Sequence, residues 1–396
     1  MQDKIAGSAV GRFQIAATAR SAIDAFIVMD VMRQANALQA AGRDIIHMEV
    51  GQPATAAPRL AREAAKRAID TDRLGYTEAL GLPALRERIS THYRRWYGIE
   101  VPASRVVVTA GSSAGFVLSF LAAFSPGDRV ALPSPGYPCY RHILKALGCE
   151  PVPLETTAET RWMPTPALLD RAAAGGPLKG LLIASPNNPT GTMVDADRLS
   201  RLVKHAAVKG IAFLSDEIYH GLTYAMPGAT ALAMSDETIV INSFSKYFSM
   251  TGWRVGWMVL PEALVRPVER LAQNLYIAPT TISQVAALAA FEAEDELESY
   301  KAVYVRNREL LLDALPGLGL SRLLPADGAF YIYADVSDWT DDSHALAGRL
   351  LDEAGVAVTP GVDFDAARGR QYWRLSYAGT TESMAEAVKR VRAWRG

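Results

Sequence analysis

The sequence predicts an α/β protein in which helices cover both faces of a mostly parallel sheet, with a smaller α+β unit beside it. In the middle of the chain, short and continuously apolar segments alternate with segments whose apolar residues recur at helical spacing. Continuous apolar strands separated by helices are typical of a parallel sheet that is buried on both faces. After Pro261 the pattern changes to long helices and then to alternating strands and helices, which indicates the second unit.

The strands of the large sheet are predicted from runs of Val, Ile, Leu, Ala and Phe that end in polar or small residues. One intervening segment, residues 195–209, has apolar residues at helical spacing and is a predicted helix. The predicted strands are residues 105–110, 129–132, 179–184, 211–214 and 238–241.

The two ends of the chain predict the smaller unit. We expect a helix over residues 29–41, closed by Gly42, and long helices over roughly 279–315. The tail reads as strand 329–336, helix 343–354, strand 372–377 and helix 382–394. We therefore predict that residues 1–50, an N-terminal arm and helix, join a C-terminal small domain (281–396, beginning with a long linking helix), and that residues 51–280 form the large domain.

Composition excludes several classes of protein. The net charge of −1 gives no basic excess for nucleic acid or an acidic membrane surface. The longest strongly apolar run, residues 115–124, is far shorter than the ~20 residues of a membrane helix. The histidines and the two cysteines, Cys139 and Cys149, lack metal-binding spacing, so no metal is expected. So few cysteines favour a cytoplasmic protein without disulfides.

Polar clusters follow several of the predicted strands, where ligands of parallel sheets bind. Ser243, Ser245 and Lys246 follow the strand at 238–241, and Arg254 comes soon after. A lysine at such a place can form an imine with an aldehyde if its amine is neutral, and hydroxyls with an arginine suit a phosphate. A lone lysine would more simply be a solvated surface residue, and the neighbouring groups argue against that alternative.

Two further clusters suit an aromatic ligand. Asp216 follows the strand at 211–214 and could hold a ring nitrogen protonated. Two unit charges ~4 Å apart at an effective dielectric near 20 interact by ~4 kcal/mol. Tyr219 and Asn188, the latter in PNNPTG, could donate to a phenolic oxygen of the same ligand. Taken singly, these residues also fit a helix cap, a core tyrosine and a turn.

Two more candidates concern anions. Ser112 and Ser113 open a helix directly after a strand, where free backbone N–H groups bind anions, although serine capping alone would explain them. Arg374 lies inside the strand at 372–377 and could fork onto a carboxylate. A structural ion pair is the alternative reading for that arginine.

Together, the strings PNNPTG, DEIY, SFSK and TGWR resemble the class I aminotransferases, which are pyridoxal phosphate (PLP) enzymes of fold type I. The matching residues run from Gly51 to Arg374, most of the chain. The resemblance implies a seven-stranded type of sheet. It also implies that Lys246 forms the Schiff base with PLP and is catalytic, that Asp216 partners the pyridine nitrogen, and that Asn188 and Tyr219 bind the phenolic oxygen.

The resemblance implies roles for the remaining candidates as well. Tyr137 is similar to the residue that stacks on the cofactor ring, and Gly51, Asn188 and Arg374 to the residues around the substrate α-carboxylate. Tyr76 resembles a tyrosine that reaches the phosphate of the neighbouring subunit, which implies a homodimer with shared active sites. The implied phosphate site consists of Arg254, Ser243, Ser245, Ser112 and Ser113, and its Ser-Ser pair departs from some relatives.

The implied reaction transfers an amino group from an L-amino acid to a 2-oxo acid, with Lys246 moving the Cα proton and pyridoxamine phosphate as the intermediate. A PLP lyase or synthase on the same scaffold would use the same residues. A PLP-binding regulator is the third alternative, but it would carry a basic DNA-binding domain in front of Gly51. The substrate side chain stays open, because Arg20, Arg33 and Arg322 cannot be assigned to it from sequence.

Overall fold

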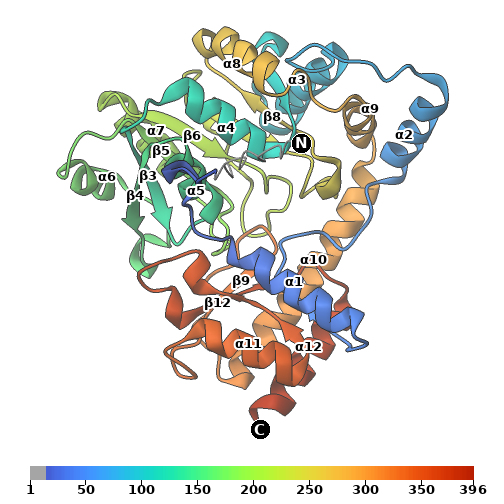
Figure 1. The fold of residues 1–396 in the computed structure, drawn as a ribbon, viewed down its shortest axis with the longest axis vertical. Coiled ribbons are helices and arrows are strands. Elements are labelled where there is room, and N and C mark those ends of the chain that lie inside the picture. Colours follow the sequence, from blue (N-terminus) through green and yellow to red (C-terminus); the bar gives the residue numbers. More distant parts are fainter. Residues whose placement is uncertain (1–14) are drawn as a thin grey trace, which may run out of the picture.

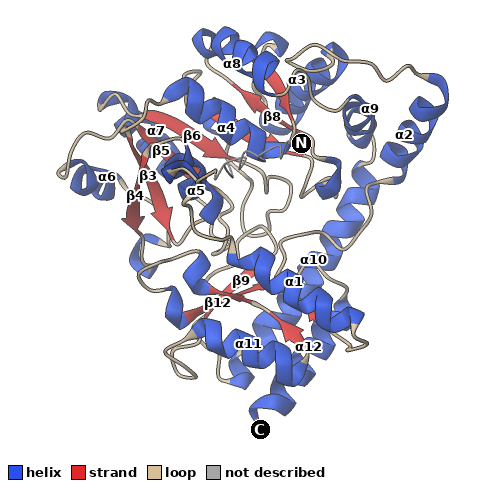
Figure 2. Ribbon diagram, viewed as in Figure 1, coloured by secondary structure: helices blue, strands red, loops and turns tan. Residues whose placement is uncertain are grey.

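The computed structural model describes residues 15–396, which form a larger part built on a seven-stranded sheet and a smaller part below it (Figures 1 and 2). The long helix α10 (Glu294–Ala314) runs from the larger part into the smaller one. The fold class predicted from the sequence is confirmed.

The large sheet has the strand order β2-β8-β7-β6-β5-β3-β4. Strand β8 is antiparallel to both of its neighbours, and the other strands run parallel to one another. The carboxyl ends of the parallel strands therefore meet at one edge of the sheet. The strands are β2 (Val106–Thr109), β3 (Arg129–Ser134), β4 (Glu150–Glu155), β5 (Gly180–Ala184), β6 (Ala212–Asp216), β7 (Ile239–Ser243) and β8 (Gly256–Val259).

Successive residues of the inner strands point to opposite faces and enter two separate cores, which explains why these strands are largely apolar. Leu181 and Ile183 of β5 join one core, and Leu182 between them joins the other. Helices α4, α5 and α8 cover the second core, and α3, α6 and α7 cover the first. The helices of this part are α2 (Arg59–Thr71), α3 (Pro83–Tyr97), α4 (Gly111–Ala123), α5 (Pro138–Ala146), α6 (Pro166–Ala173), α7 (Ala196–Val208), α8 (Glu262–Leu275) and α9 (Thr281–Ala290).

The smaller part joins both ends of the described chain. Strand β1 (Ile46–His47) pairs in parallel with β10 (Val356–Ala357), and α1 (Ile27–Ala40) packs on the same unit. The N-terminal segment thus returns to the C-terminal unit, whereas the exact domain boundaries stay a prediction. The other elements are β9 (Tyr331–Asp335), β11 (Thr359–Pro360) and β12 (Tyr372–Ser376), which form an antiparallel sheet, and the helices α11 (Ser343–Ala354) and α12 (Thr381–Arg395).

The predicted strands differ from the observed ones by at most a few residues, but two strands of the large sheet, and the two-residue strands β1, β10 and β11 of the smaller part, were not predicted. Strand β4 contains two prolines and two glutamates at the edge of the sheet, and β8 is short. The helical region 279–315 is broken between α9 and α10 at residues 291–293. Within residues 15–396, no helix is long and apolar enough to cross a membrane.

Candidate functional site

A cavity of about 470 Å³ lies where the carboxyl ends of the parallel strands face the smaller part. Segments that follow β2, β3, β5, β6 and β7 line it from the sheet side. The start of α1, the loop after β1, and residues of β9 and β12 line it from the other side. This position is the usual ligand site of a parallel α/β sheet.

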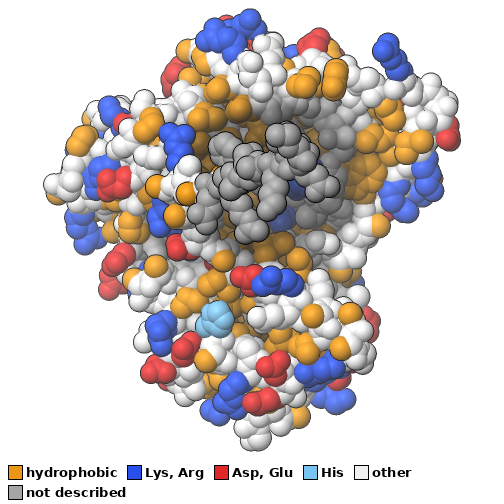
Figure 3. All heavy atoms as spheres, in the orientation of Figure 1, with side chains coloured by type: hydrophobic (Ala, Val, Ile, Leu, Met, Phe, Trp, Pro, Cys, Tyr) orange, Lys and Arg blue, Asp and Glu red, His pale blue; other side chains and the backbone are white. Residues whose placement is uncertain are grey.

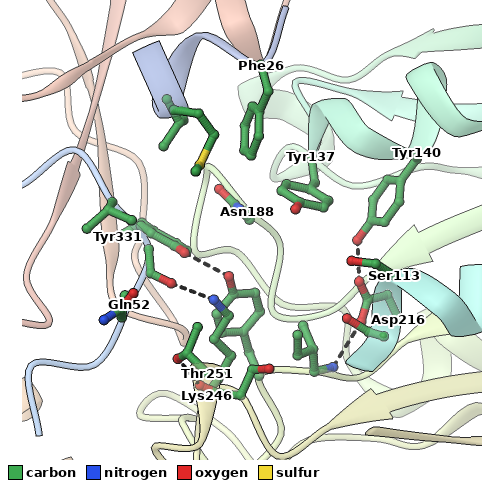
Figure 4. A pocket seen from close by; sticks show the side chains of 18 of the residues that line it. Phe26, Gln52, Ser113, Tyr137, Tyr140, Asn188, Asp216, Lys246, Thr251 and Tyr331 are labelled. Carbon is green, nitrogen blue, oxygen red and sulfur yellow. Dashed lines mark hydrogen bonds between the residues drawn. The ribbon is translucent and has the colours of Figure 1, made fainter. Parts of the chain in front are cut away.

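Lys246 projects into this cavity from the turn that follows β7 (Figure 4). Its Nζ donates a hydrogen bond to the backbone carbonyl of Gly51. Burial lowers the pKa of Lys246 to about 7, with further contributions from the positive charges of Arg374 and Arg254. A large fraction of the amine is therefore neutral near pH 7, which a nucleophile and proton acceptor needs.

Asp216 is the last residue of β6 and its carboxylate is buried beside the cavity. Its Oδ1 accepts the backbone N–H of Ile218 at 3.0 Å, and its Oδ2 accepts a hydrogen bond from the hydroxyl of Tyr140. Burial raises the pKa of Asp216 to about 6, against the opposing effects of Tyr140, Ile218 and Lys246. The carboxylate is thus ionised at neutral pH and able to pair with a protonated ring nitrogen.

Arg374, in the middle of β12, is held rigidly beside the cavity. Its guanidinium carbon lies 4.4 Å from the ring centre of Tyr331 and 4.7 Å from that of Phe364. Nη1 donates to Asn188 Oδ1 at 3.0 Å, and Nη2 donates to the carbonyl of Glu49. Within residues 15–396 its buried Nε has no hydrogen-bond partner. Since the Asn188 oxygen faces Arg374, the amide nitrogen of Asn188 is the group left to donate to a ligand.

Tyr219 joins this group through the hydroxyl of Tyr331, at 2.8 Å. Both tyrosines are buried. The hydroxyl of Tyr331 also packs so closely against Gly51 that a Cβ at that position would overlap it. Gly51 is therefore required for packing, in addition to its carbonyl contact with Lys246.

A candidate anion site lies at the N-terminus of α4. Ser112, Ser113, Ser245 and Arg254 all line the cavity there. Gly111, at the start of the helix, has a φ of +76°, and a Cβ on it would overlap the guanidinium of Arg254. The glycine thus lets the arginine approach the helix N-terminus, where backbone N–H groups and a bidentate cation together suit a phosphate.

The three remaining sequence candidates lie at different positions relative to the cavity. Tyr137 lies directly before α5 and lines the cavity. Ser243 lies behind the cavity wall, where its hydroxyl donates to Ser245 Oγ at 2.9 Å, so it is not among the lining residues. Tyr76, in the loop between α2 and α3, is 85% exposed and does not line the cavity of its own chain.

The arginines left unassigned by the sequence lie outside the cavity. Arg33 pairs with Asp30 at 2.9 Å on the exposed side of α1, and Arg322 pairs with Asp335 at 2.9 Å. Arg20 is exposed. Among the described residues, the cations that line the cavity are Lys246, Arg254 and Arg374.

Several lining residues were not predicted from the sequence. Tyr140 lies on α5, three residues after Tyr137, which occupies the N-cap position of that helix. This helical spacing was the signal that could have placed Tyr140 beside Tyr137 at the cavity. Tyr331 gave no comparable signal, because it lies far along the chain inside an apolar strand. The others are Gln52, Thr251, Val50, Phe116 and Ile218, and the apolar residues Phe26, Val28, Met29 and Met32 at the start of α1.

Comparison with known proteins gives consistent results. The family model described as aminotransferase class I and II matches residues 43–391. A valine–pyruvate aminotransferase of Mycobacterium tuberculosis is 46% identical over 95% of this chain and 97% of its own length. An aspartate/prephenate aminotransferase of Thermus thermophilus is 35% identical over 89% of this chain and 91% of its own.

Solved structures agree with these sequence matches. The crystal structure of an aminotransferase from Mycobacterium tuberculosis superposes with a TM-score of 0.93 at 46% identity, covering 96% of this chain and 99% of the other. The aspartate aminotransferase of Thermus thermophilus with maleate superposes with a TM-score of 0.91 at 33% identity, covering 96% of this chain and 100% of the other.

Proposed function

Because the chain belongs to the class I and II aminotransferase family and therefore transfers amino groups between amino acids and 2-oxo acids, we propose that it does so with PLP bound around Lys246. Enzymes of this family use PLP. One observation carries the proposal. A lysine whose pKa is lowered to about 7, chiefly by burial, lines the same cavity as the buried carboxylate of Asp216.

The groups around the cavity fit PLP in kind and in charge. The candidate anion site at the N-terminus of α4, which Arg254 can approach because residue 111 is a glycine, suits the phosphate. Asp216 suits the protonated pyridine nitrogen, because its carboxylate is ionised above about pH 6. When bound, PLP supplies an electron-withdrawing ring that stabilises negative charge at the substrate Cα. The residues proposed to hold it are Ser112, Ser113, Tyr137, Asn188, Asp216, Tyr219, Ser245, Lys246 and Arg254, with Ser243 supporting Ser245 and Tyr76 contributed to the partner subunit.

Arg374 is proposed to bind the substrate α-carboxylate, with Gly51 and Asn188 beside it. The rings of Tyr331 and Phe364 fix the plane of the guanidinium. Its buried Nε, which has no hydrogen-bond partner in the described part of the chain, is free to donate to an anionic group. An arginine held in one plane loses little freedom when it binds a carboxylate. This contact would hold the amino acid in one orientation, with its Cα near Lys246.

Lys246 is proposed to move the proton of the reaction. Its neutral Nζ accepts the proton from the substrate Cα and later returns it, which positioned acid–base groups accelerate ~10²–10⁴-fold. The carbonyl of Gly51 holds Nζ within the cavity between these steps. A pKa of about 7 suits both directions of the transfer.

We also propose a homodimer in which Tyr76 of each chain reaches the phosphate site of the other. Support comes from the exposure of Tyr76 and from the neighbouring exposed residues Tyr276 and Ile277. Thr281 Oγ1 donates to the carbonyl of Gly75 at 2.6 Å and holds the Tyr76 loop against α9. Apolar side chains gather near α9 in Figure 3, whereas charges of both signs cover the outer rim.

A reducing compartment such as the cytoplasm is consistent with the free thiols of Cys139 and Cys149.

The function is tested with Lys246→Ala and a panel of amino acids. Wild-type protein loaded with PLP should yield pyridoxamine phosphate and a 2-oxo acid in a single turnover, and the variant should yield neither. If the cofactor remains PLP and ammonia or a thiol is released, the result would instead support the lyase alternative. Formation of pyridoxamine phosphate by the Lys246→Ala variant at the wild-type rate would contradict the role of the lysine.

A further inference from the structure

The start of α1 presents apolar side chains to the cavity. Phe26 precedes the helix, and Val28, Met29 and Met32 are spaced so that they lie on one face. In Figure 4, Phe26 and Tyr137 lie together across the cavity from Lys246. Their rings meet edge to face, with centres 5.8 Å apart.

A different face of α1 anchors the helix to the smaller part. Val31, Ala35 and Leu38 pack with Leu351 of α11 and with Ala357 of β10. The methionines are not needed for this packing, and Met29 is 47% exposed. The helix therefore has a second apolar face, which is directed at the cavity.

The apolar face lies next to the proposed carboxylate site. Val28 packs with Phe364, and the ring of Phe364 also lies 4.7 Å from the guanidinium carbon of Arg374. A substrate whose α-carboxylate is bound by Arg374 would thus have apolar atoms beside it. The cations that line the cavity within residues 15–396 already have other roles: Lys246 with the Cα proton, Arg254 with the phosphate and Arg374 with the α-carboxylate.

We infer that Phe26, Met29 and Met32 form the seat of the substrate side chain, and that the substrates are monocarboxylic amino acids with apolar side chains. The inference rests on the proposed function and names the substrate class of the same site. A second carboxylate would lose its water against methionine and phenylalanine without gaining a cation from residues 15–396 of the same chain. Because methionines adapt their shape, aliphatic side chains of different lengths should be accepted with graded rates.

The same seat serves both halves of the reaction, since the amino donor and the 2-oxo acceptor bind in turn at one site. The preferred acceptors are therefore monocarboxylic 2-oxo acids with apolar or very short side chains. A dicarboxylic acceptor such as 2-oxoglutarate should be used poorly.

Single-turnover rates with PLP-loaded enzyme test the inference directly. We expect leucine, methionine and norvaline to react at least 100-fold faster, in kcat/KM terms, than aspartate and glutamate. Each methylene in an apolar pocket contributes ~10–200-fold, which is the basis for expecting such a margin. Aspartate or glutamate within tenfold of the best apolar amino acid would overturn the inference.

A matched pair of variants assigns the preference to α1. Met32→Lys places a cation in the seat and should raise the ratio of glutamate to leucine turnover at least tenfold. Gln34→Lys adds the same charge to an exposed position of the same helix and should leave the ratio unchanged. An unchanged ratio in Met32→Lys, or equal changes in both variants, would contradict the assignment.

A binding measurement separates this inference from the proposed function. 5-Methylhexanoate and glutarate share one carboxylate and differ in an isopropyl group against a second carboxylate. Calorimetry with PLP-loaded protein should give at least tenfold tighter binding of 5-methylhexanoate. If no amino acid reacts, the proposed function fails, and this comparison still decides the seat: equal or tighter binding of glutarate overturns it.

Discussion

Asp216 keeps its negative charge in a buried place because of its neighbours. Burial alone favours the protonated carboxyl, and the hydroxyl of Tyr140 and the N–H of Ile218 oppose this effect. Tyr140 therefore acts as a positioning residue, which determines both where the carboxylate points and over what pH range it is ionised.

Tyr140→Phe should weaken PLP binding by about 10–100-fold, the range for a lost hydrogen bond to a charged group. The pKa of Asp216 is about 6 and should rise without the hydroxyl, so affinity should be lost at a higher pH as the solution is acidified. Absorbance titrations with PLP between pH 5.5 and 8 measure both effects. Tyr300→Phe removes a similar tyrosine–carboxylate bond, to Glu296, away from the cavity, and should change neither. Equal PLP affinity of Tyr140→Phe and wild type at every pH would contradict the role of Tyr140.

Lys246 should titrate near pH 7 in cofactor-free protein. Burial, Arg374 and Arg254 lower its pKa to about 7. The fraction of reactive neutral amine therefore increases as the pH rises through 7 and is nearly complete by pH 8. An exposed lysine becomes reactive only near pH 10.4. Competitive labelling with an amine reagent, read by peptide mass spectrometry, gives the midpoint. A midpoint above pH 9 would mean that the cavity does not favour the neutral amine.

The sequence predicts the polar residues that directly follow strands, because in a parallel sheet the carboxyl ends of the strands share one edge. Asp216, Asn188, Lys246 and Ser112 all meet there as predicted. It does not predict Tyr331 or Phe26. Such side chains reach the cavity only through the packing of the smaller part against the sheet, and local sequence patterns do not encode that packing.

At the scale of elements, α1 depends on a residue far along the chain. Its N-cap position, Phe26, provides no side-chain cap, and the backbone N–H of Val28 donates instead to Asp363 Oδ2 at 3.1 Å. The carbonyl of Asp363 in turn accepts a hydrogen bond from Arg141 of α5 at 2.7 Å. Asp363 thus connects the start of α1 in the smaller part with α5 of the larger part.

Asp363→Ala should lower the free energy of unfolding by about 1 kcal/mol, the usual cost of removing a helix cap. It should also raise KM for amino substrates more than it lowers kcat, because the start of α1 lines the cavity. Denaturant unfolding and steady-state kinetics measure the two effects. Asp363→Asn retains an acceptor oxygen and should behave more like the wild type. A change in kcat alone would contradict this role of α1.

The elements with strong periodicity are predicted best. The helix 343–354 and the strand 372–377 are found within one residue of their predicted bounds. Strand β4 escapes prediction because it contains prolines, which inside a sheet are found mainly on edge strands, and edge position is a property of the assembled sheet. The order of the strands likewise follows from the assembled topology.

At the scale of the whole molecule, the Tyr76 loop links the site to assembly. The loop is held against α9 but directs its tyrosine away from the cavity of its own chain. In a dimer, this exposed ring would reach the phosphate site of the partner chain, which it cannot do in a monomer.

Sedimentation should give twice the mass of one chain. Tyr76→Ala should lower PLP affinity about 10–100-fold while the dimer persists, since a hydrogen bond to a charged phosphate is worth about 1.5–3 kcal/mol. Ile69→Ala, another exposed apolar position, is the control and should leave PLP affinity unchanged. A monomer at micromolar concentration would contradict the shared site.

The attachment of PLP to Lys246 is the central claim and can be measured directly. Protein loaded with PLP is treated with borohydride, which makes a covalent lysine–PLP bond permanent, and is then digested and analysed by mass spectrometry. The account predicts the PLP-derived mass on the peptide that contains Lys246 and its absence from other lysines. The same mass on another lysine, or its absence from every peptide of a protein that retains full activity, would contradict it.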